Sequence, residues 1–203
     1  MRPDFDPGPV ILTGRHVRLE PIEPKHAADL LEAGRDEAVW RYMPVPPPKT
    51  LDDSRAWIEE AASETTAGRQ VAFAIIHKGD GRAVGSTRLL DIRRPDRGIE
   101  IGWTWIGQAY QRSAVNTECK LLLLVHAFES LGAARVQLKT DGRNESAQRA
   151  IERLGAVREG VLRRNTRLWD GHVRNTVYYS ILDTEWPAAK KTLLEKIRRY
   201  SDQ

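Results

Sequence analysis

Apolar side chains along this chain recur with two different spacings, and the spacing changes where glycine, proline or short polar runs interrupt it. Residues 99–106 alternate between apolar and polar positions, with Ile99, Ile101, Trp103 and Trp105 expected on one face of a strand. Other segments carry apolar residues three and four positions apart, which is the period of an amphipathic helix. The chain is therefore expected to mix strands with helices.

Strands are predicted where short apolar or alternating runs lie between turn signals. They fall at residues 10–20, where the turn signal Thr13-Gly14 breaks the strand, and at residues 71–76, 83–90, 99–106, 135–140, 157–167 and 173–182. The segments Gly79-Asp80-Gly81 and Trp169-Asp170-Gly171 each join two neighbouring strands as a hairpin turn. Hairpins between consecutive strands indicate a sheet that is mostly antiparallel.

Helices are predicted from apolar stripes and from the residues that start and stop them. They begin at or near Pro24, Thr50, Val115, Asn144 and Trp186. The third of these helices spans about residues 115–131, is rich in leucine, and ends before a glycine.

The order of these elements predicts an α+β fold, with a mixed, mostly antiparallel sheet of about seven strands flanked by helices. Residues 1–203 are expected to form a single domain, because no repeat or change of composition marks a second one. Residues 1–9, rich in proline, aspartate and glycine, are expected to be loose, and residues 186–203 to form the C-terminal helix.

Composition narrows the class of protein without identifying its ligand. Apolar residues make up 40% and charged residues 30%, which is ordinary for a globular protein. The net charge of +4 comes from signs that are interleaved along the chain. This pattern argues against nucleic acid as the partner and suits an anionic cofactor.

Cys119 is the only cysteine, so no intrachain disulfide forms, and a reducing, cytoplasmic location is expected. We interpret Cys119 as a small packing residue. The five histidines show no metal-ligand spacing, so no metal site is expected. No signal peptide and no apolar run of membrane-spanning length are found, so no membrane partner is expected.

One stretch combines a strand, a small polar turn and the start of a helix in an order that suits a phosphate ligand. Residues 100–106 form the strand, and residues 111–117 lead into the leucine-rich helix. Successive backbone amides in such a turn, together with the helix dipole, bind a diphosphate, and Arg112 adds a positive charge. The same order also fits an ordinary strand–loop–helix connection, so the residues alone leave both interpretations open.

Several segments follow one another in an informative order, namely residues 12–19, 100–103, 111–118, 143–146, 150–156 and 159–163, with the hairpin at Asp170-Gly171. Together they resemble the RimJ/RimL-like branch of the GNAT N-acetyltransferase superfamily, and the resemblance covers most of the chain. It implies the GNAT fold and an acyltransferase that uses acetyl-coenzyme A (acetyl-CoA). The acceptor would be an amine, either a protein N-terminus or a small molecule.

The resemblance assigns the contacts of acetyl-CoA to two parts of the chain. Backbone groups of Trp105 and Ile106 would pair with the pantetheine arm and hold the thioester, and Asn144 would hydrogen-bond that arm. The diphosphate would lie on the loop made by Gln111, Arg112, Ser113, Ala114, Val115, Asn116 and Thr117.

The chain departs from the family's pattern at three places. Ala114 and Asn116 stand where the loop usually has small residues such as glycine. Ala147 stands where many relatives carry serine. Ile151 stands where a tyrosine often protonates the leaving thiolate, so no general acid is evident there, and water would have to supply the proton.

Direct attack by an amine requires a group that removes a proton from it. Glu100 is one catalytic candidate, since relatives often have an acid on this strand, and Glu159 is the other, since it matches a position used by RimL-like enzymes. Either side chain could instead be solvated or paired with an arginine. Burial would raise the pKa of the carboxyl and make it a better base.

The sequence does not identify the acceptor. Trp40, Tyr42 and the proline-rich residues 44–48 are expected to line its site, with ordinary packing as the alternative. The arginines around the last hairpin would attract an acidic acceptor or form a solvated face. Two alternative functions stay open, a small-molecule (antibiotic or metabolite) acetyltransferase and a non-catalytic acyl-CoA-binding or sensor protein, and a homodimer is not excluded.

Overall fold

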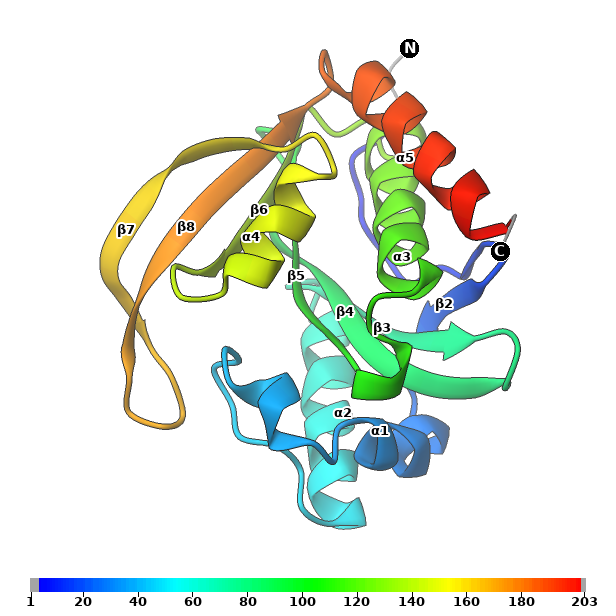
Figure 1. Cartoon of the computed structure of the whole chain (residues 1–203), viewed down its shortest axis with the longest axis vertical. Coiled ribbons are helices and arrows are strands. Elements are labelled where there is room, and N and C mark those ends of the chain that lie inside the picture. Colours follow the sequence, from blue (N-terminus) through cyan, green and yellow to red (C-terminus); the bar gives the residue numbers. More distant parts are fainter. Residues whose placement is uncertain (1–3, 202–203) are drawn as a thin grey trace.

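The structure, a computed structural model, describes residues 4–201, and its framework is one eight-stranded sheet in the order β1-β2-β3-β4-β5-β6-β8-β7 (Figure 1). The strands are β1 (Leu12–Thr13), β2 (Val17–Pro21), β3 (Val71–His77), β4 (Arg82–Arg93), β5 (Gly98–Ile106), β6 (Arg135–Asp141), β7 (Val157–Arg167) and β8 (Val173–Leu182). All neighbours are antiparallel except β5 and β6, which confirms the predicted mixed sheet. One more strand is present than predicted, because the first segment turns at Gly14, whose amide donates to the Val17 carbonyl.

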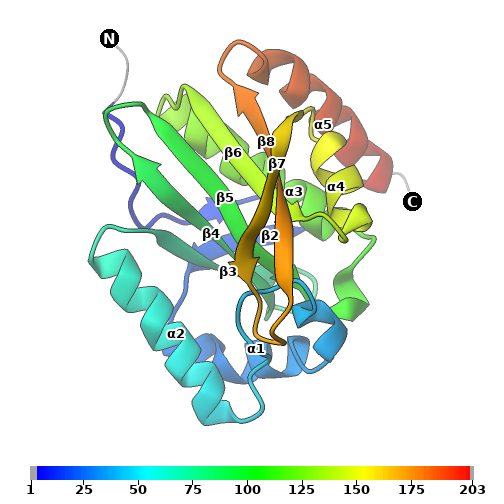
Figure 2. The same ribbon diagram turned by 90° about the vertical axis from the view of Figure 1, so that its left-hand side faces the viewer.

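Helices cover both faces of the sheet (Figure 2). They are α1 (Ala27–Ala33), α2 (Leu51–Thr66), α3 (Ala114–Val125), α4 (Glu145–Glu152) and α5 (Trp186–Ser201). Residues of α3 and α5 pack in one apolar core, and residues of α1 and α2 pack in a second core on the opposite face. The leucine-rich helix ends its α-helical part at Val125 and continues as one π-helical turn, His126–Ser130.

Strand β5 does not keep the simple alternation that its sequence predicts. Ile99 and Ile101 lie in the core beside α3, whereas Trp105 lies in the core beside α2, and Trp103 packs against that second core. Trp103 has a φ of 50°, and the register between β4 and β5 shifts at this point. A β-bulge therefore swaps the two faces, and the prediction that all four side chains share one face is wrong.

The central parallel pair, β5 and β6, stays together over only three registered residue pairs, the last of which is Glu100 with Gln137. Beyond this pair β5 remains bonded to β4, and β6 remains bonded to β8. The sheet thus divides into two halves that separate from an apex at Glu100. The edge of β5 after Glu100 keeps backbone groups that no strand on that side engages.

Candidate functional site

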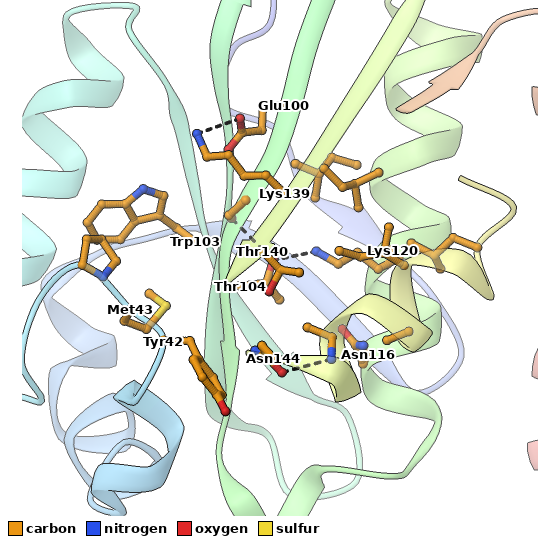
Figure 3. A pocket seen from close by; sticks show the side chains of 18 of the residues that line it. Tyr42, Met43, Glu100, Trp103, Thr104, Asn116, Lys120, Lys139, Thr140 and Asn144 are labelled. Carbon is orange, nitrogen blue, oxygen red and sulfur yellow. Dashed lines mark hydrogen bonds and ion pairs between the residues drawn. The ribbon is translucent and has the colours of Figure 1, made fainter. Parts of the chain in front are cut away.

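A cavity of about 430 Å³ occupies the space where β5 and β6 separate. One wall comes from α3 and α4, with Asn116, Lys120 and Asn144 among its residues. Figure 3 shows Tyr42 and Met43 on the opposite wall, with the strands between the two walls. A cavity that lies between two separated strands can receive one molecule from each face of the sheet.

Glu100 marks the apex of this cavity, and its residue is 1% exposed. Its Oε2 accepts a hydrogen bond from Gln137 Nε2 at 2.8 Å and forms an ion pair with Lys139 Nζ at 3.0 Å (Figure 3). Its Oε1 is buried and has no hydrogen-bond partner in the described part of the chain. A buried carboxylate oxygen without a donor is costly, so this atom is suited to accept a proton or a hydrogen bond from a ligand.

Gly102 provides the room that this carboxylate occupies. A Cβ atom at residue 102 would lie 2.7 Å from Glu100 Oε1 and 3.1 Å from Leu90 Cδ2. Any larger side chain at this position would therefore push the carboxylate away from its place in the cavity wall.

Lys120 reaches the cavity from α3 although only 7% of the residue is exposed. Its Nζ donates to Thr104 Oγ1 at 2.6 Å, and Thr104 Oγ1 lies 2.7 Å from Thr87 Oγ1. Burial lowers the pKa of Lys120 from its ordinary value. This ammonium has a neutral hydroxyl as its near neighbour, which leaves its charge available to a ligand.

Arg174 contributes a second buried cation, on the wall that carries Tyr42. Its Nε donates to Thr176 Oγ1 at 3.0 Å, and its Nη1 lies 3.5 Å from the Tyr42 carbonyl oxygen. Burial lowers the pKa of Arg174 as well. Together with Lys139, these groups make the cavity wall more positive than negative, since Glu100 is the one carboxylate among its described lining residues.

Some backbone amides of the predicted diphosphate loop donate hydrogen bonds within the loop itself. The amide of Gln111 donates to the Gln108 carbonyl at 3.2 Å, and the amide of Val115 donates to Ser113 Oγ at 3.3 Å. Ser113 is the N-cap of α3, so the amides of the first helical turn, including Ala114, lie at a helix start with partial positive charge. The loop can still offer part of an anion site.

Arg112 takes the left-handed conformation that glycine favours, with a φ of 58°. A non-glycine residue in this region costs on the order of 1 kcal/mol, and such strain is often kept at binding sites. The chain thus has arginine at a position where the backbone conformation would favour glycine.

The other predicted cofactor residues lie in three different settings. Asn116 and Asn144 line the cavity, and Asn144 Oδ1 also caps α4 by accepting from the Ala147 amide at 3.1 Å. The side chains of Trp105 and Ile106 are buried in the two cores, so a ligand could use only backbone groups there, and the Ile106 carbonyl already accepts from Gln111 Nε2 at 3.0 Å. Thr117 lines a neighbouring groove between α3, α4 and α5.

Glu159 lies on β7 and does not line the cavity. Both of its oxygens face the guanidinium of Arg135, and Ser180 Oγ donates to Oε1 at 2.8 Å. The hydrogen bonds from Arg135 hold the pKa of the Glu159 carboxyl below its usual value. The catalytic role of Glu159 stays a prediction. Its pairing with Arg135 agrees with the alternative that this carboxylate forms an ion pair with an arginine.

Sequence reasoning missed two cations of the cavity. Lys120 interrupts the buried stripe of α3, between Cys119 and Leu121, and a lysine on an apolar face is a signal that could have been followed. Lys139 lies on the predicted strand, but its contact with Glu100 depends on pairing between distant strands. Trp40, expected at the acceptor site, is fully buried in a core, whereas Tyr42 and Pro44 do line the cavity.

Cys119 is fully buried, and burial raises the pKa of its thiol to about 11. It is therefore unreactive, as expected of a packing residue. No helix in the described part of the chain combines the length and apolar content needed to cross a membrane. Residues 4–201 also hold no cluster of His, Cys, Asp and Glu side chains arranged for a metal ion.

Comparison with known proteins gives consistent similarities. Residues 16–157 match the family model described as the Acetyltransferase (GNAT) domain. YdaF of Bacillus subtilis (strain 168), provisionally named a ribosomal N-acetyltransferase, is 32% identical over 111 residues, which are 55% of this chain and 60% of that protein. The matched part is thus less than two thirds of that relative.

Solved structures share the whole architecture. A GCN5-related N-acetyltransferase from Brucella melitensis superposes with a TM-score of 0.90 at 30% identity, covering 97% of this chain and 89% of that one. RimJ of Mycobacterium smegmatis, in complex with CoA-disulfide, superposes with a TM-score of 0.81 over 97% of each chain. At 20% identity the second likeness concerns the fold alone.

Proposed function

The chain belongs to the acetyltransferase (GNAT) domain family, and from this premise we propose that it transfers an acetyl group from acetyl-CoA to an amine by direct attack. The names of YdaF and of RimJ among the similar proteins support the RimJ/RimL-like branch. The observation that carries the proposal is the split between β5 and β6, which opens a cavity beside a free strand edge and places the unpartnered oxygen of Glu100 at its apex.

Acetyl-CoA fits the features of the α3 side of this cavity. Backbone groups on the free edge of β5, around Trp105 and Ile106, would pair with the pantetheine arm, and Asn144 would add a hydrogen bond from α4. The diphosphate would lie at the start of α3, near Arg112, where helix amides and a guanidinium favour an anion. That RimJ, which has the same fold, was solved in complex with CoA-disulfide supports coenzyme A as the ligand.

Glu100 is our first candidate for the group that removes a proton from the attacking amine. Its Oε1 has no hydrogen-bond partner among the described residues, its side chain lines the cavity, and Lys139 Nζ lies 3.0 Å from Oε2. Glu159 remains the second candidate. Its exclusion from the cavity and its pairing with Arg135 favour Glu100.

The acceptor would enter from the wall that carries Tyr42, Met43 and Arg174. A polycationic acceptor would meet the like charges of Arg174 and Lys139 there, which is unfavourable at short range. A peptide N-terminus or a small amine of low charge fits better than an aminoglycoside or a polyamine. The charges of Arg174 and Lys139 thus weigh against the antibiotic-acetylating alternative.

Thiol release from acetyl-CoA tests the proposal. A mixed panel of peptides, polyamines and aminoglycosides would be offered as acceptors, while tryptophan fluorescence follows CoA binding in parallel. Thiol release that depends on a peptide or small amine supports the proposal. Tight CoA binding with no release for any amine would instead identify a non-catalytic acyl-CoA-binding protein.

A further inference from the structure

Transfer of an acetyl group from a thioester leaves a thiolate, and a proton donor in the cavity would speed its departure. Titratable side chains in the cavity lining of the described chain are few, namely Tyr42, Glu100, Lys120, Lys139 and Arg174. The donor must be able to lose a proton near neutral pH and must lie on the wall formed by α3 and α4.

Four of these five groups are poorly suited to that task. Glu100 faces the amine as the candidate base, and Lys139 is held by Glu100 at 3.0 Å. Arg174 stays protonated at any physiological pH, because a guanidinium does not release its proton in proteins. Tyr42 donates its hydroxyl to the Arg143 carbonyl at 3.4 Å, at an exposed position.

Lys120 is the remaining group, and its surroundings fit a proton donor. It extends from α3 to Thr104 at the bulge of β5, and Figure 3 shows it on the side of the cavity where Asn116 and Asn144 lie. Within residues 4–201 its ammonium makes one hydrogen bond, to Thr104, which leaves two of its three protons for a ligand. No carboxylate lies within ion-pair distance of it in the described structure.

The groups packed around Lys120 decide how its charge behaves. Thr104 on β5 is neutral, Ile151 on α4 and Leu154 just after it are apolar residues of the same cavity, and Cys119 is its neighbour on α3. Burial lowers the pKa of Lys120, and Cys119 on α3 and Glu100 on β5 raise it to a smaller extent. Lys139 on β6 lines the same cavity. The ammonium thus releases its proton more readily than an exposed lysine does.

We propose that Lys120 is the general acid of the transfer, giving a proton to the departing CoA thiolate, with Thr104 as the residue that positions it. The inference rests on the proposed function. It also accounts for the apolar Ile151 in this wall, which leaves the thiolate no other proton donor from α4.

Every bond and proton is accounted for in the proposed transfer. The amine nitrogen forms a bond to the thioester carbonyl carbon, and its surplus proton goes to Glu100 or to water. The carbon–sulfur bond breaks with its electron pair on sulfur, and the Lys120 ammonium transfers one proton to that sulfur. Neutral Lys120 is then reprotonated from solvent, and no other reactant is needed.

The decisive experiment compares Lys120→Met with Lys120→Arg, which keeps the charge but cannot release a proton. Lys191→Met is the matched control, because Lys191 is an exposed lysine on α5. Each protein is assayed with acetyl-CoA and with an acetyl aryl thioester, whose acidic thiol leaves without protonation. CoA binding is followed by tryptophan fluorescence, and folding by thermal unfolding.

We expect kcat with acetyl-CoA to fall about 100-fold in both Lys120 variants, within the range of general acid catalysis. With the aryl thioester the loss should be less than about fivefold, and Lys191→Met should match wild type. Wild type should also lose activity as pH rises toward the ordinary lysine pKa of about 10.4. This alkaline decline should vanish in Lys120→Met.

Two results would overturn the assignment of Lys120. One is a kcat within about threefold of wild type in both variants, and the other is an equal loss with both donors while the alkaline decline persists. If the Met variant fails to fold, the Arg variant and the wild-type pH profile decide. Absence of amine-dependent thiol release by the wild type would instead reject the proposed function, and this inference with it.

Discussion

The Glu100 carboxylate and the Lys139 ammonium lie 3.0 Å apart at the point where β5 and β6 stop pairing. The two residues are on different strands of the one parallel pair, so the contact holds the two halves of the sheet together at the apex of the cavity. Lys139 also neutralises a charge that would be costly to bury alone. The second oxygen of Glu100, Oε1, is buried and has no hydrogen-bond donor in the described part of the chain.

Replacing Glu100 by Gln should reduce kcat about 100-fold, because the amide cannot take a proton from the amine. The amide oxygen can still accept from Gln137 and Lys139, so the fold should persist. Thiol-release rates across pH check this prediction, and Glu159→Gln is the matched variant, expected to stay within about threefold of wild type. The reverse pattern would move the catalytic role to Glu159.

Gly102→Ala should lower activity at least tenfold through the position of Glu100, since the new Cβ would lie 2.7 Å from Oε1. The effect should be much smaller in the Glu100→Gln background, where no catalytic carboxylate remains to be displaced. A double-mutant cycle of kcat measures this coupling. Fully additive losses would show that Gly102 acts independently of Glu100.

Arg112→Gly should separate stability from cofactor binding. The backbone at φ 58° suits glycine, so thermal stability should be unchanged or higher by up to about 1 kcal/mol. Loss of the guanidinium should weaken CoA binding several-fold and reduce its dependence on salt. Fluorescence titration with CoA at two salt concentrations measures both effects.

Arg164→Gly is the matched control for that variant, because Arg164 has a φ of 51° and lies on β7, away from the loop. The same relief of backbone strain is expected there, with CoA affinity equal to wild type. If both variants lose affinity alike, the charge of Arg112 does not contact the cofactor.

Acid stability should depend on Glu20 in β2. Burial by itself raises the pKa of this carboxyl, but hydrogen bonds from His26, Lys25 and Arg18 outweigh it and lower the pKa to about 2. A depressed pKa stabilises the fold above the ordinary value of 4.5, and the gain is lost as pH falls toward 2. The contribution is on the order of 2 kcal/mol.

Glu20→Gln should therefore be less stable than wild type at pH 7, and the difference should shrink steadily as pH falls from 5 to 3. Urea unfolding at pH 7, 5, 4 and 3 checks the convergence. A difference between the two proteins that stays constant with pH would contradict the link to ionisation.

Local patterns predicted most of the fold, because hairpin turns and helix caps lie next to the elements that they define. Thr50 caps α2 and Asn144 caps α4 as expected, and each side chain accepts from an amide three residues on. The local pattern did not predict the swap of faces at Trp103, since a bulge depends on pairing with β4 and leaves no apolar–polar signal; only the family resemblance implied a bulge in this strand. The eighth strand was not counted from the sequence because β1, before the turn at Gly14, has only two residues.

The candidate site divides in the same way. Glu100, Asn116 and Asn144 were chosen from the sequence and do lie around one cavity. Lys120, Lys139 and Arg174 gain their importance from burial and from neighbours on distant strands, which no local pattern encodes. The partner of Glu159, Arg135, lies on another strand, so the sequence left both interpretations of that carboxylate open.

A crystal structure of this protein grown with CoA tests the central claim most directly. We predict the pantetheine arm along the free edge of β5, the sulfur within reach of Lys120, and the diphosphate on the amides between Gln111 and Thr117. Coenzyme bound elsewhere, or an empty cavity at saturating CoA with those amides bonded only to protein oxygens, would contradict the account.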